Sequence, residues 1–183
     1  RKKPRGTSTR RSCKVGRDVR TNIAGEFQKS NLAAALQTAE LICGRLDEDK
    51  IYEALSQIRI SGRMEEIAPG IIVDVSHNIQ GMQGFVQTVE ANYHGMKKRI
   101  LFAASHQNEE EYMKNILKTI PEIEAFYTVG IHKRRINEAE FQDAFRKMID
   151  RNQETTVCFV VGSFYLAGMA KEFINQEEEN VRL

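Results

Sequence analysis

The sequence is poor in cysteine and has no long apolar run. Its three cysteines, Cys13, Cys43 and Cys158, form neither a close pair nor a metal-ligand spacing. This usage is typical of a reducing compartment, so we expect a cytoplasmic protein. No apolar stretch approaches the roughly 18 residues of a membrane span. The basic N-terminus is not followed by an apolar segment, so we expect neither a membrane helix nor a secretory leader.

Several catalytic and nucleotide-binding motifs are also missing. The sequence contains no G-x-x-x-x-G-K-[ST] phosphate loop and no G-x-G-x-x-G turn. No Ser-His-Asp or Cys-His set can be assigned from residue order, and no His/Cys group has the spacing of a zinc site. The residues present therefore predict no metal site and no recognisable machinery for holding a triphosphate with Mg²⁺.

What is present is an ordinary globular composition with unevenly spread charge. The 183 residues are 41% hydrophobic and 28% charged, enough for one domain and a piece of another. The formal net charge is only +2, yet residues 1–20 hold nine Lys or Arg against one Asp. No aromatic residue interleaves with these cations and no base-reading motif appears. A solvated tail is therefore favoured over a nucleic-acid site.

Residues 25–59 have the pattern of two helices. Ser30 and Asp47 are the candidate N-caps, and we expect residues 25–28 to form a turn before the first helix. Asn31 would then lie early in that helix. Beyond residue 60 the pattern changes to alternating strands and helices, so we place a domain boundary there, between residues 1–60 and residues 61–183.

The second part of the chain predicts an α/β fold. Strands are expected at residues 71–74, 99–104, 125–129 and 156–161, and helices at roughly 79–93, 108–119, 137–150 and 165–175. Asn108 and Asn137 are candidate caps, and the acidic residues 176–183 are expected to fray. This alternation indicates βαβ units. We therefore expect a Rossmann-like, mostly parallel sheet with helices on both faces.

One stretch delivers several functional side chains at the end of a predicted strand. An apolar β-branched run ends at Asp74, and His77 and Asn78 follow just before a helical pattern. In an open α/β sheet the ligand crevice lies at the carboxyl ends of the strands. A capping role for Asp74 or Asn78 is the alternative. Because helix capping does not require an imidazole between them, the whole cluster favours a binding site.

Polar or small turns follow the other predicted strands as well, at residues 105–108, 130–135 and 162–165. In a parallel sheet all these turns would share one edge, which suits an anionic, hydrogen-bonding ligand such as a nucleotide or an amino acid. Polar βα loops are common without any ligand, and this stays an alternative. The candidate site residues are His77, Ser163 and Tyr165. Surface roles are favoured for His106, His132, Lys133, Arg134 and Arg135.

Four ordered segments resemble a known enzyme family. They are Gly25-x-Phe27-Gln28-x-x-Asn31, Gly62-Arg63-Met64-Glu65, Asp74-x-x-His77-Asn78 and Gly162-Ser163-Phe164-Tyr165-Leu166-Ala167-Gly168. Over residues 15–175 they resemble the C-terminal portion of folylpolyglutamate synthase/dihydrofolate synthase, of the Mur ligase superfamily. Cell-wall Mur ligases share the Gly-Arg-Met-Glu and Asp-x-x-His pieces, whereas the last segment resembles the folate branch.

The resemblance implies an ATP-dependent carbon–nitrogen ligase of folate biosynthesis and one-carbon metabolism. In that family, the carboxylate of folate or dihydropteroate becomes an acyl phosphate, which the amino group of glutamate attacks. A central ATPase domain supplies the phosphate loop and the Mg²⁺ ligands, and a Rossmann-like C-terminal domain closes over it. Residues 1–60 would be a helical remnant of the first domain and residues 61–183 the second. We therefore expect this chain alone to have no ligase turnover.

The resemblance also implies roles toward ATP. Asn31 and His77 would flank the adenine, and Asp74 would hold the ribose. Arg63 would reach the phosphates, and His77 and Arg63 are the implied catalytic residues. The usual Asp-Gly-Ala-His-Asn-Pro reads Asp-Val-Ser-His-Asn-Ile here, so the turn lacks the family's Gly and Pro.

Toward glutamate, the resemblance implies Ser163 and Tyr165, with Arg134 or Arg135 on the carboxylates. The expected partners are ATP with Mg²⁺, glutamate and folate or dihydropteroate, without nucleic acid or membrane. Two alternatives stay open: a Mur-type ligase acting on a cell-wall precursor, and a non-enzymatic binding module that uses the basic N-terminal tail. The sequence does not determine an oligomeric state.

Overall fold

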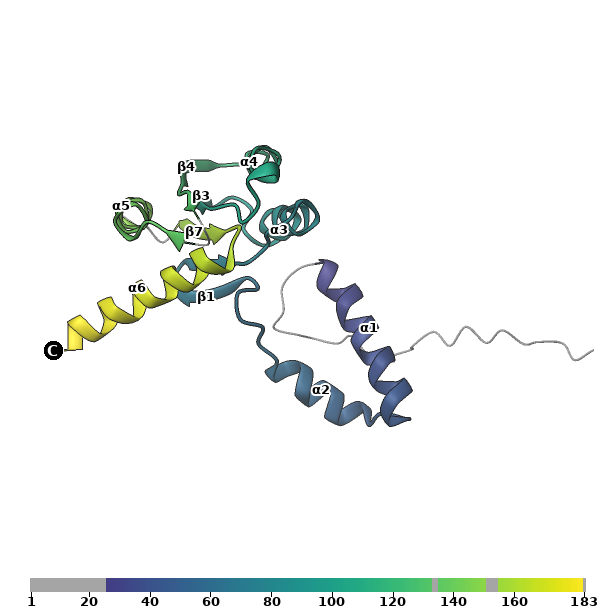
Figure 1. Ribbon diagram of the computed structural model, residues 1–183. Coiled ribbons are helices and arrows are strands. Elements are labelled where there is room, and N and C mark those ends of the chain that lie inside the picture. The colour runs from purple at the N-terminus through teal and green to yellow at the C-terminus, as the bar shows by residue number, and fades with distance from the viewer. Residues whose placement is uncertain (1–25, 133–134, 151–154, 183) are drawn as a thin grey trace, which may run out of the picture. The chain divides into compact units, whose positions relative to one another are not determined.

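The computed structural model describes residues 26–132, 135–150 and 155–182. The chain divides into two compact units, of which one contains Lys29–Ile58 and the other Arg59–Leu183 (Figure 1). The basic segment 1–20, the glycine at position 25 and the Lys133-Arg134 pair lie outside the described residues. The predicted domain boundary at residue 60 stays a prediction.

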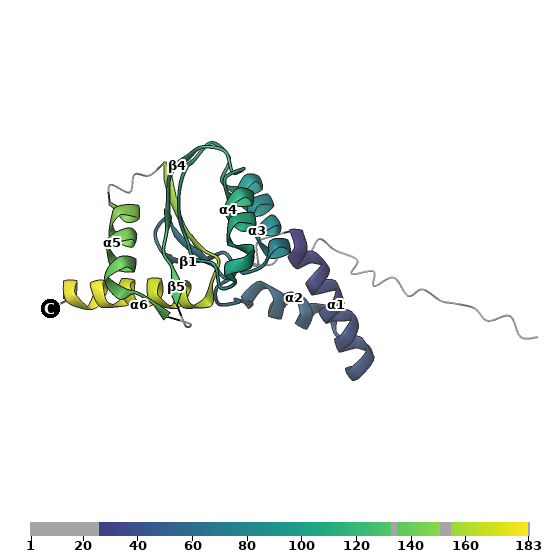
Figure 2. The ribbon, with the colours of Figure 1, turned by 45° about the horizontal axis from the view of Figure 1, so that its top comes forward.

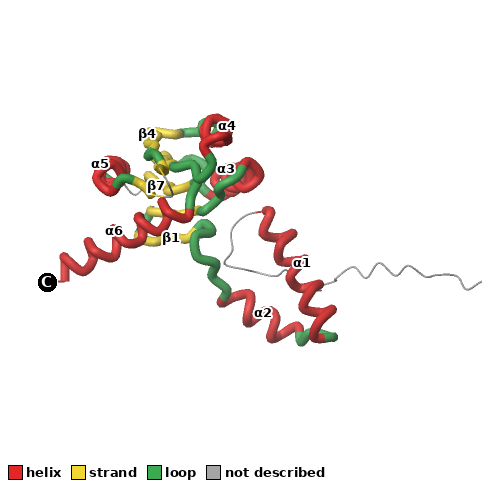
Figure 3. The backbone as a smooth tube through the Cα atoms, in the orientation of Figure 1, coloured by secondary structure: helices red, strands yellow, loops and turns green. Residues whose placement is uncertain are grey.

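The first unit is helical, as predicted. Its helices are α1 (Glu26–Cys43) and α2 (Glu48–Gln57), joined by a short loop (Figure 3). Asp47 caps α2, because its Oδ1 accepts hydrogen bonds from the amides of Asp49 and Lys50 at 3.1 and 3.3 Å. The predicted start of the first helix was wrong. Residues 26–28 are helical and Ser30 lies inside α1, because no Gly or Pro interrupts residues 26–43.

The second unit is built on a five-stranded sheet of order β1-β2-β7-β3-β4. Its strands are β1 (Glu65–Ala68), β2 (Ile71–Asp74), β3 (Lys97–Phe102), β4 (Ile123–Thr128) and β7 (Thr156–Val161). Strands β2, β7, β3 and β4 are mutually parallel, and β1 pairs antiparallel with β2 at the edge. The predicted mostly parallel α/β sheet is therefore confirmed.

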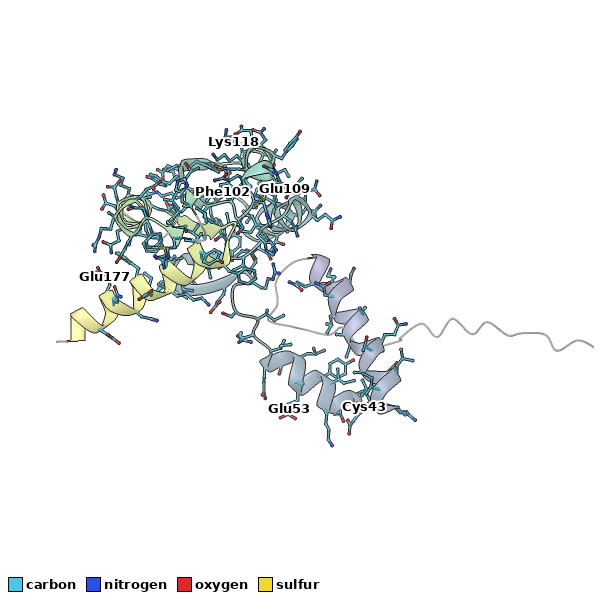
Figure 4. The ribbon with its side chains drawn as sticks, in the orientation of Figure 1. Cys43, Glu53, Phe102, Glu109, Lys118 and Glu177 are labelled. Atoms are coloured by element: carbon cyan, nitrogen blue, oxygen red, sulfur yellow. The ribbon has the colours of Figure 1, made fainter. Side chains whose placement is uncertain are left out.

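Helices cover both faces of this sheet. Figure 2 shows α3 (Ile79–Asn92) and α4 (Glu110–Leu117) on one side, and α5 (Glu138–Ile149) and α6 (Phe164–Arg182) on the other. Alternate strand residues serve the two faces. Ile72 and Phe159 pack in the cluster under α3 and α4, whereas Val73 and Val160 pack in the cluster under α5 and α6. Side chains fill both layers, and Phe102 is fully buried in the cluster under α3 and α4 (Figure 4).

Several local predictions needed correction. A short 3-10 helix, η1 (Gln107–Glu109), precedes α4, so Asn108 lies within it and caps nothing. Helix α6 continues to Arg182 instead of fraying after residue 175, and the Arg146–Glu177 ion pair at 3.0 Å ties it to α5. The predicted cap at Asn137 is confirmed, since its Oδ1 accepts from the Glu140 amide at 3.0 Å.

Two pairings were not predicted. Strand β1 joins β2 through Pro69 and Gly70, and Gly70 has a φ of +72°. Pro followed by Gly suits the two central positions of a type II turn. A small hairpin, β5 (Ile131–His132) with β6 (Arg135–Ile136), occupies the region expected to be a plain loop.

Among the helices of the described residues, none combines the length and apolar character needed to cross a bilayer.

Candidate functional site

The four parallel strands end in line. Asp74 pairs with Val161 of β7, which pairs with Phe102 of β3, and Phe102 pairs with Thr128 of β4. The turns that follow therefore lie along one edge of the sheet. The helices that start there alternate between faces: α3 and α4 on one, α5 and α6 on the other. Ligand crevices form at carboxyl edges where neighbouring connections diverge in this way.

Asp74 organises the turns at this edge. Its side chain is buried, with Oδ2 accepting from the Met64 amide at 3.0 Å and Oδ1 from the Ser76 amide at 2.8 Å. The first bond connects the end of β2 to the turn that carries Arg63. Each carboxylate oxygen retains a second lone pair. The same group can therefore hold the loops and accept a hydrogen bond from a ligand hydroxyl.

Arg63 lies in a tightly constrained turn. Gly62 has a φ of +72° and Met64 a φ of +45°, both in the left-handed region. A Cβ at position 62 would lie 2.7 Å from Cγ1 of Val75, and the Val75 amide donates to the Gly62 carbonyl at 2.8 Å. Val75 therefore packs against the turn. The side chain of Arg63, which lies between Gly62 and Met64 in sequence, is partly exposed.

His77 is held by the loop that follows β2. Its Nδ1 lies 2.9 Å from the Val75 carbonyl oxygen. Because a carbonyl oxygen only accepts, we assign the proton to Nδ1, which leaves Nε2 as the acceptor in the neutral ring. The ring lies 5.5 Å from that of Phe164 at an angle of 48°. Asn78 has the capping role that was the alternative, since its Oδ1 accepts from the Gly81 amide at 2.7 Å.

Ser163 and Tyr165 follow β7 at the same edge, in different environments. Ser163 is fully buried, and its Oγ accepts from the Leu166 amide at 3.2 Å, which caps α6. Tyr165 and its neighbour Phe164 are exposed. Gly162 precedes them with a φ of +111°, where a Cβ would meet the Ala103 carbonyl oxygen at 2.6 Å. The aromatic pair, rather than the serine hydroxyl, faces solvent here.

The other predicted residues are less closely gathered. Arg135 is exposed on β6, and Arg134 lies outside the described residues. Asn31 lies on α1, and its role toward adenine stays a prediction. The second unit thus brings Arg63, Asp74 and His77 onto one edge. No group of His, Cys, Asp and Glu within the described part of the chain could hold a metal ion.

Sequence reasoning missed two residues beside this site. Lys171 of α6 contacts Glu65, with its Nζ 2.6 Å from Oε2. Partial burial acts to raise the pKa of Glu65, but hydrogen bonds from Lys171 and from the Gly62 amide outweigh it, so the pKa lies below its ordinary value. Glu65 belongs to the Gly-Arg-Met-Glu segment and could have been found. Lys171 is 106 residues away in sequence, and no local signal marks it.

No protein-family model matches the sequence. The curated dihydrofolate synthase/folylpolyglutamate synthase of Bacillus subtilis (strain 168) is 23% identical over 109 residues, which are 56% of this chain and 25% of the relative. The chain thus aligns with a quarter of that protein's length.

Solved structures agree on the fold. The apo form of L. casei folylpolyglutamate synthase superposes with a TM-score of 0.67 at 19% identity, over 84% of this chain and 38% of that chain. E. coli FolC in complex with DHPP and ADP superposes with a TM-score of 0.67 at 18% identity, over 80% of this chain and 39% of that chain. A folylpolyglutamate synthase–AMPPCP–folate complex superposes with a TM-score of 0.68 at 20% identity, over 84% of this chain and 38% of that chain. The chain is therefore partially similar to folylpolyglutamate synthase, and it spans about two fifths of these structures.

Proposed function

We propose, from this partial similarity, that the chain is part of an ATP-dependent glutamate ligase of the folylpolyglutamate synthase type. Its second unit would contribute adenosine and glutamate contacts. The observation that carries the proposal is the hydrogen bond between the Met64 amide and Asp74. This bond joins the Arg63 turn to the strand end that also presents His77, so a carboxylate, a guanidinium and an imidazole share one edge.

The chemistry of these three groups suits a nucleotide. Asp74 would accept from the ribose hydroxyls through the lone pairs that its two amide bonds leave over. The Arg63 guanidinium would donate in a fork to phosphate oxygens. His77 would flank the adenine. The fold is shared with structures of E. coli FolC with ADP and of folylpolyglutamate synthase with AMPPCP, which supports a nucleotide as the ligand.

The proposed reaction joins glutamate to a folate-type carboxylate. The carboxylate of folate or dihydropteroate would attack the terminal phosphoryl group of ATP, giving an acyl phosphate and ADP. The glutamate amine would then attack the acyl carbon, release phosphate and lose a proton. Arg63 would stabilise the charge on the transferring phosphoryl group. Tyr165 and one of Arg134 and Arg135 would bind glutamate, beside the turn in which the buried Ser163 caps α6. The Mg²⁺ ligands would come from other parts of the ligase.

A nitrogen-detected NMR titration of the chain with ATP, and then with glutamate, tests this proposal. We expect ATP to shift the resonances of Arg63 and residues 74–78, and glutamate to shift those of residues 163–165. The Asp74→Asn variant should weaken the ATP response. Asp143→Asn is the matched control, because Asp143 is exposed on α5 and pairs at 2.6 Å with Lys147, four residues along the same helix. A wild-type chain with no shifts at millimolar ATP would contradict the proposal.

A further inference from the structure

Lys171 of α6 reaches the turn that carries Arg63. Its Nζ donates to Oγ of Ser61 and to Oε2 of Glu65, both at 2.6 Å. The Lys171 and Glu65 side chains are about one-third exposed, at 28% and 34%. One ammonium group therefore joins the second turn of α6 to the two ends of a five-residue segment, residues 61–65.

The same carboxylate oxygen of Glu65 holds the backbone of that segment. The Gly62 amide donates to Oε2 at 2.5 Å. On the opposite side, the Gly62 carbonyl accepts from the Val75 amide and the Met64 amide donates to Asp74. The turn is thus tied to α6 through Glu65 and to the end of β2 through Val75 and Asp74. Arg63 lies between these two attachments.

The conformation of the turn needs such support. Gly62 and Met64 both have positive φ, and for methionine this region is disfavoured by contact between Cβ and the backbone. A residue in that state persists where its surroundings hold it. The Arg63 backbone donates one further hydrogen bond, from its amide to the Ile60 carbonyl at 3.1 Å. The direction in which the Arg63 side chain leaves the turn therefore depends on both attachments.

We infer that Lys171 is a positioning residue for Arg63: by holding the Glu65 carboxylate against the Gly62 amide, it sets the turn from which Arg63 reaches a phosphate. This inference rests on the proposed nucleotide site and adds to it a residue from a distant helix. Lys171 would contact no ligand. Its loss should weaken binding of the phosphates more than binding of the nucleoside.

The test compares ADP with adenosine as ligands of three chains: wild type, Lys171→Met and Lys171→Arg. In Lys171→Met, ADP affinity should fall about fivefold to tenfold, the effect of disturbing one charge-assisted hydrogen bond, while adenosine affinity stays unchanged. The Gly62 and Met64 amide resonances should shift without ligand. Lys171→Arg should retain ADP binding, because a guanidinium can still donate to Ser61 and Glu65.

Two further variants make the outcome decisive. Glu65→Gln removes the negative charge of the Lys171–Glu65 pair and should reproduce the selective loss of ADP affinity. Lys147→Met removes an exposed ammonium that pairs with Asp143 and should change nothing. Equal losses for ADP and adenosine, or no loss, would overturn the positioning role while leaving the nucleotide site intact. Absence of any ADP and adenosine binding by the wild-type chain would overturn the proposed site, and the inference with it.

Discussion

The carboxylate of Asp74 connects two turns that come from different parts of the sequence. Its oxygens accept from the amides of Met64 and Ser76, and its side chain is only 2% exposed. A buried amide that loses its acceptor carries the full cost of desolvation. The residue that we propose for ribose binding is therefore also a stabilising residue, and its substitution will change both properties.

Asp74→Ala should lower the free energy of unfolding by about 3 kcal/mol, because two amides lose a charged acceptor in a buried place. Urea denaturation followed by circular dichroism measures this change. Asp143→Ala, at an exposed position on α5, should stay within about 0.5 kcal/mol of wild type. Equal effects of the two substitutions would mean that the hydrogen bonds of Asp74 contribute nothing to stability.

Gly62→Ala should destabilise the chain by about 3 kcal/mol, since the left-handed backbone and the close contact with Val75 act together. Gly95→Ala is the matched control: Gly95 has a φ of +77° but no atom within 4 Å of an added Cβ. It should lose only about 1 kcal/mol, from the backbone alone. Urea unfolding curves of both variants separate the two contributions. Equal losses would show that Val75 makes no difference.

At the scale of elements, the N-termini of α3 and α6 lie at the carboxyl edge of the sheet. Asn78 caps α3, and Ser163 caps α6 through a hydrogen bond to the Leu166 amide. Ser76, in the loop that precedes α3, is also buried. Its hydroxyl oxygen has no hydrogen-bond partner among the described residues. Two buried serines of one edge thus have opposite energetic roles.

Ser163→Ala should cost about 1 kcal/mol, the usual contribution of an N-cap. Ser76→Ala should be neutral or stabilising by up to about 1 kcal/mol, because it removes a buried, unsatisfied hydroxyl. It also introduces the alanine of the Asp-Gly-Ala-His-Asn-Pro pattern that this segment resembles. Thermal unfolding of both variants measures the contrast. Destabilisation by Ser76→Ala would reveal a partner for this hydroxyl.

The pairing of α6 with the Arg63 turn should depend on pH. The pKa of Glu65 is lowered in the folded chain, so its stabilising effect is present above the pKa of the unfolded state. That effect should be complete above about pH 5 and lost as the pH falls through the lower, folded-state pKa. The stability difference between wild type and Glu65→Gln, measured by urea unfolding from pH 3 to 7, should shrink toward acid. Because both side chains are partly exposed, we expect less than about 1 kcal/mol. A difference independent of pH would contradict this pairing.

At the scale of the whole molecule, the chain matches only part of the folylpolyglutamate synthase structures that it resembles. It aligns with 38–42% of the similar folylpolyglutamate synthase chains, and its sequence contains no phosphate loop. The groups that we propose for adenosine, phosphate and glutamate would position the reactants without the phosphate loop that cradles a triphosphate. Binding and turnover should therefore separate in this protein.

The purified chain should bind ATP weakly and catalyse no ATP-dependent glutamylation of folate or dihydropteroate. Incorporation of labelled glutamate, with ADP release measured in parallel, checks this prediction. A complete bacterial folylpolyglutamate synthase serves as the positive control for the assay. Glutamylation well above the no-enzyme background would refute the prediction and would mean that these 183 residues suffice for catalysis.

Local signals in the sequence were enough to determine most elements. The runs that became β2 and β7 are apolar, β-branched and bounded by polar turns, and their predicted limits match the structure. Asp47 and Asn137 cap helices as expected, because a cap depends only on residues two or three positions away. The alternation of strands and helices likewise predicted a parallel sheet with its turns on one edge.

Tertiary structure alone decided the strand order, the edge strand β1 and the attachment of Lys171 to Glu65. Strand β1 is short and half-exposed, so it carries no hydrophobic pattern, and it is stabilised by pairing with β2. The Lys171–Glu65 contact joins residues 106 apart. The residues next to Lys171 and Glu65 in sequence therefore do not predict this contact. The sequence by itself determined which residues reach the carboxyl edge, whereas only long-range packing decided which of them touch.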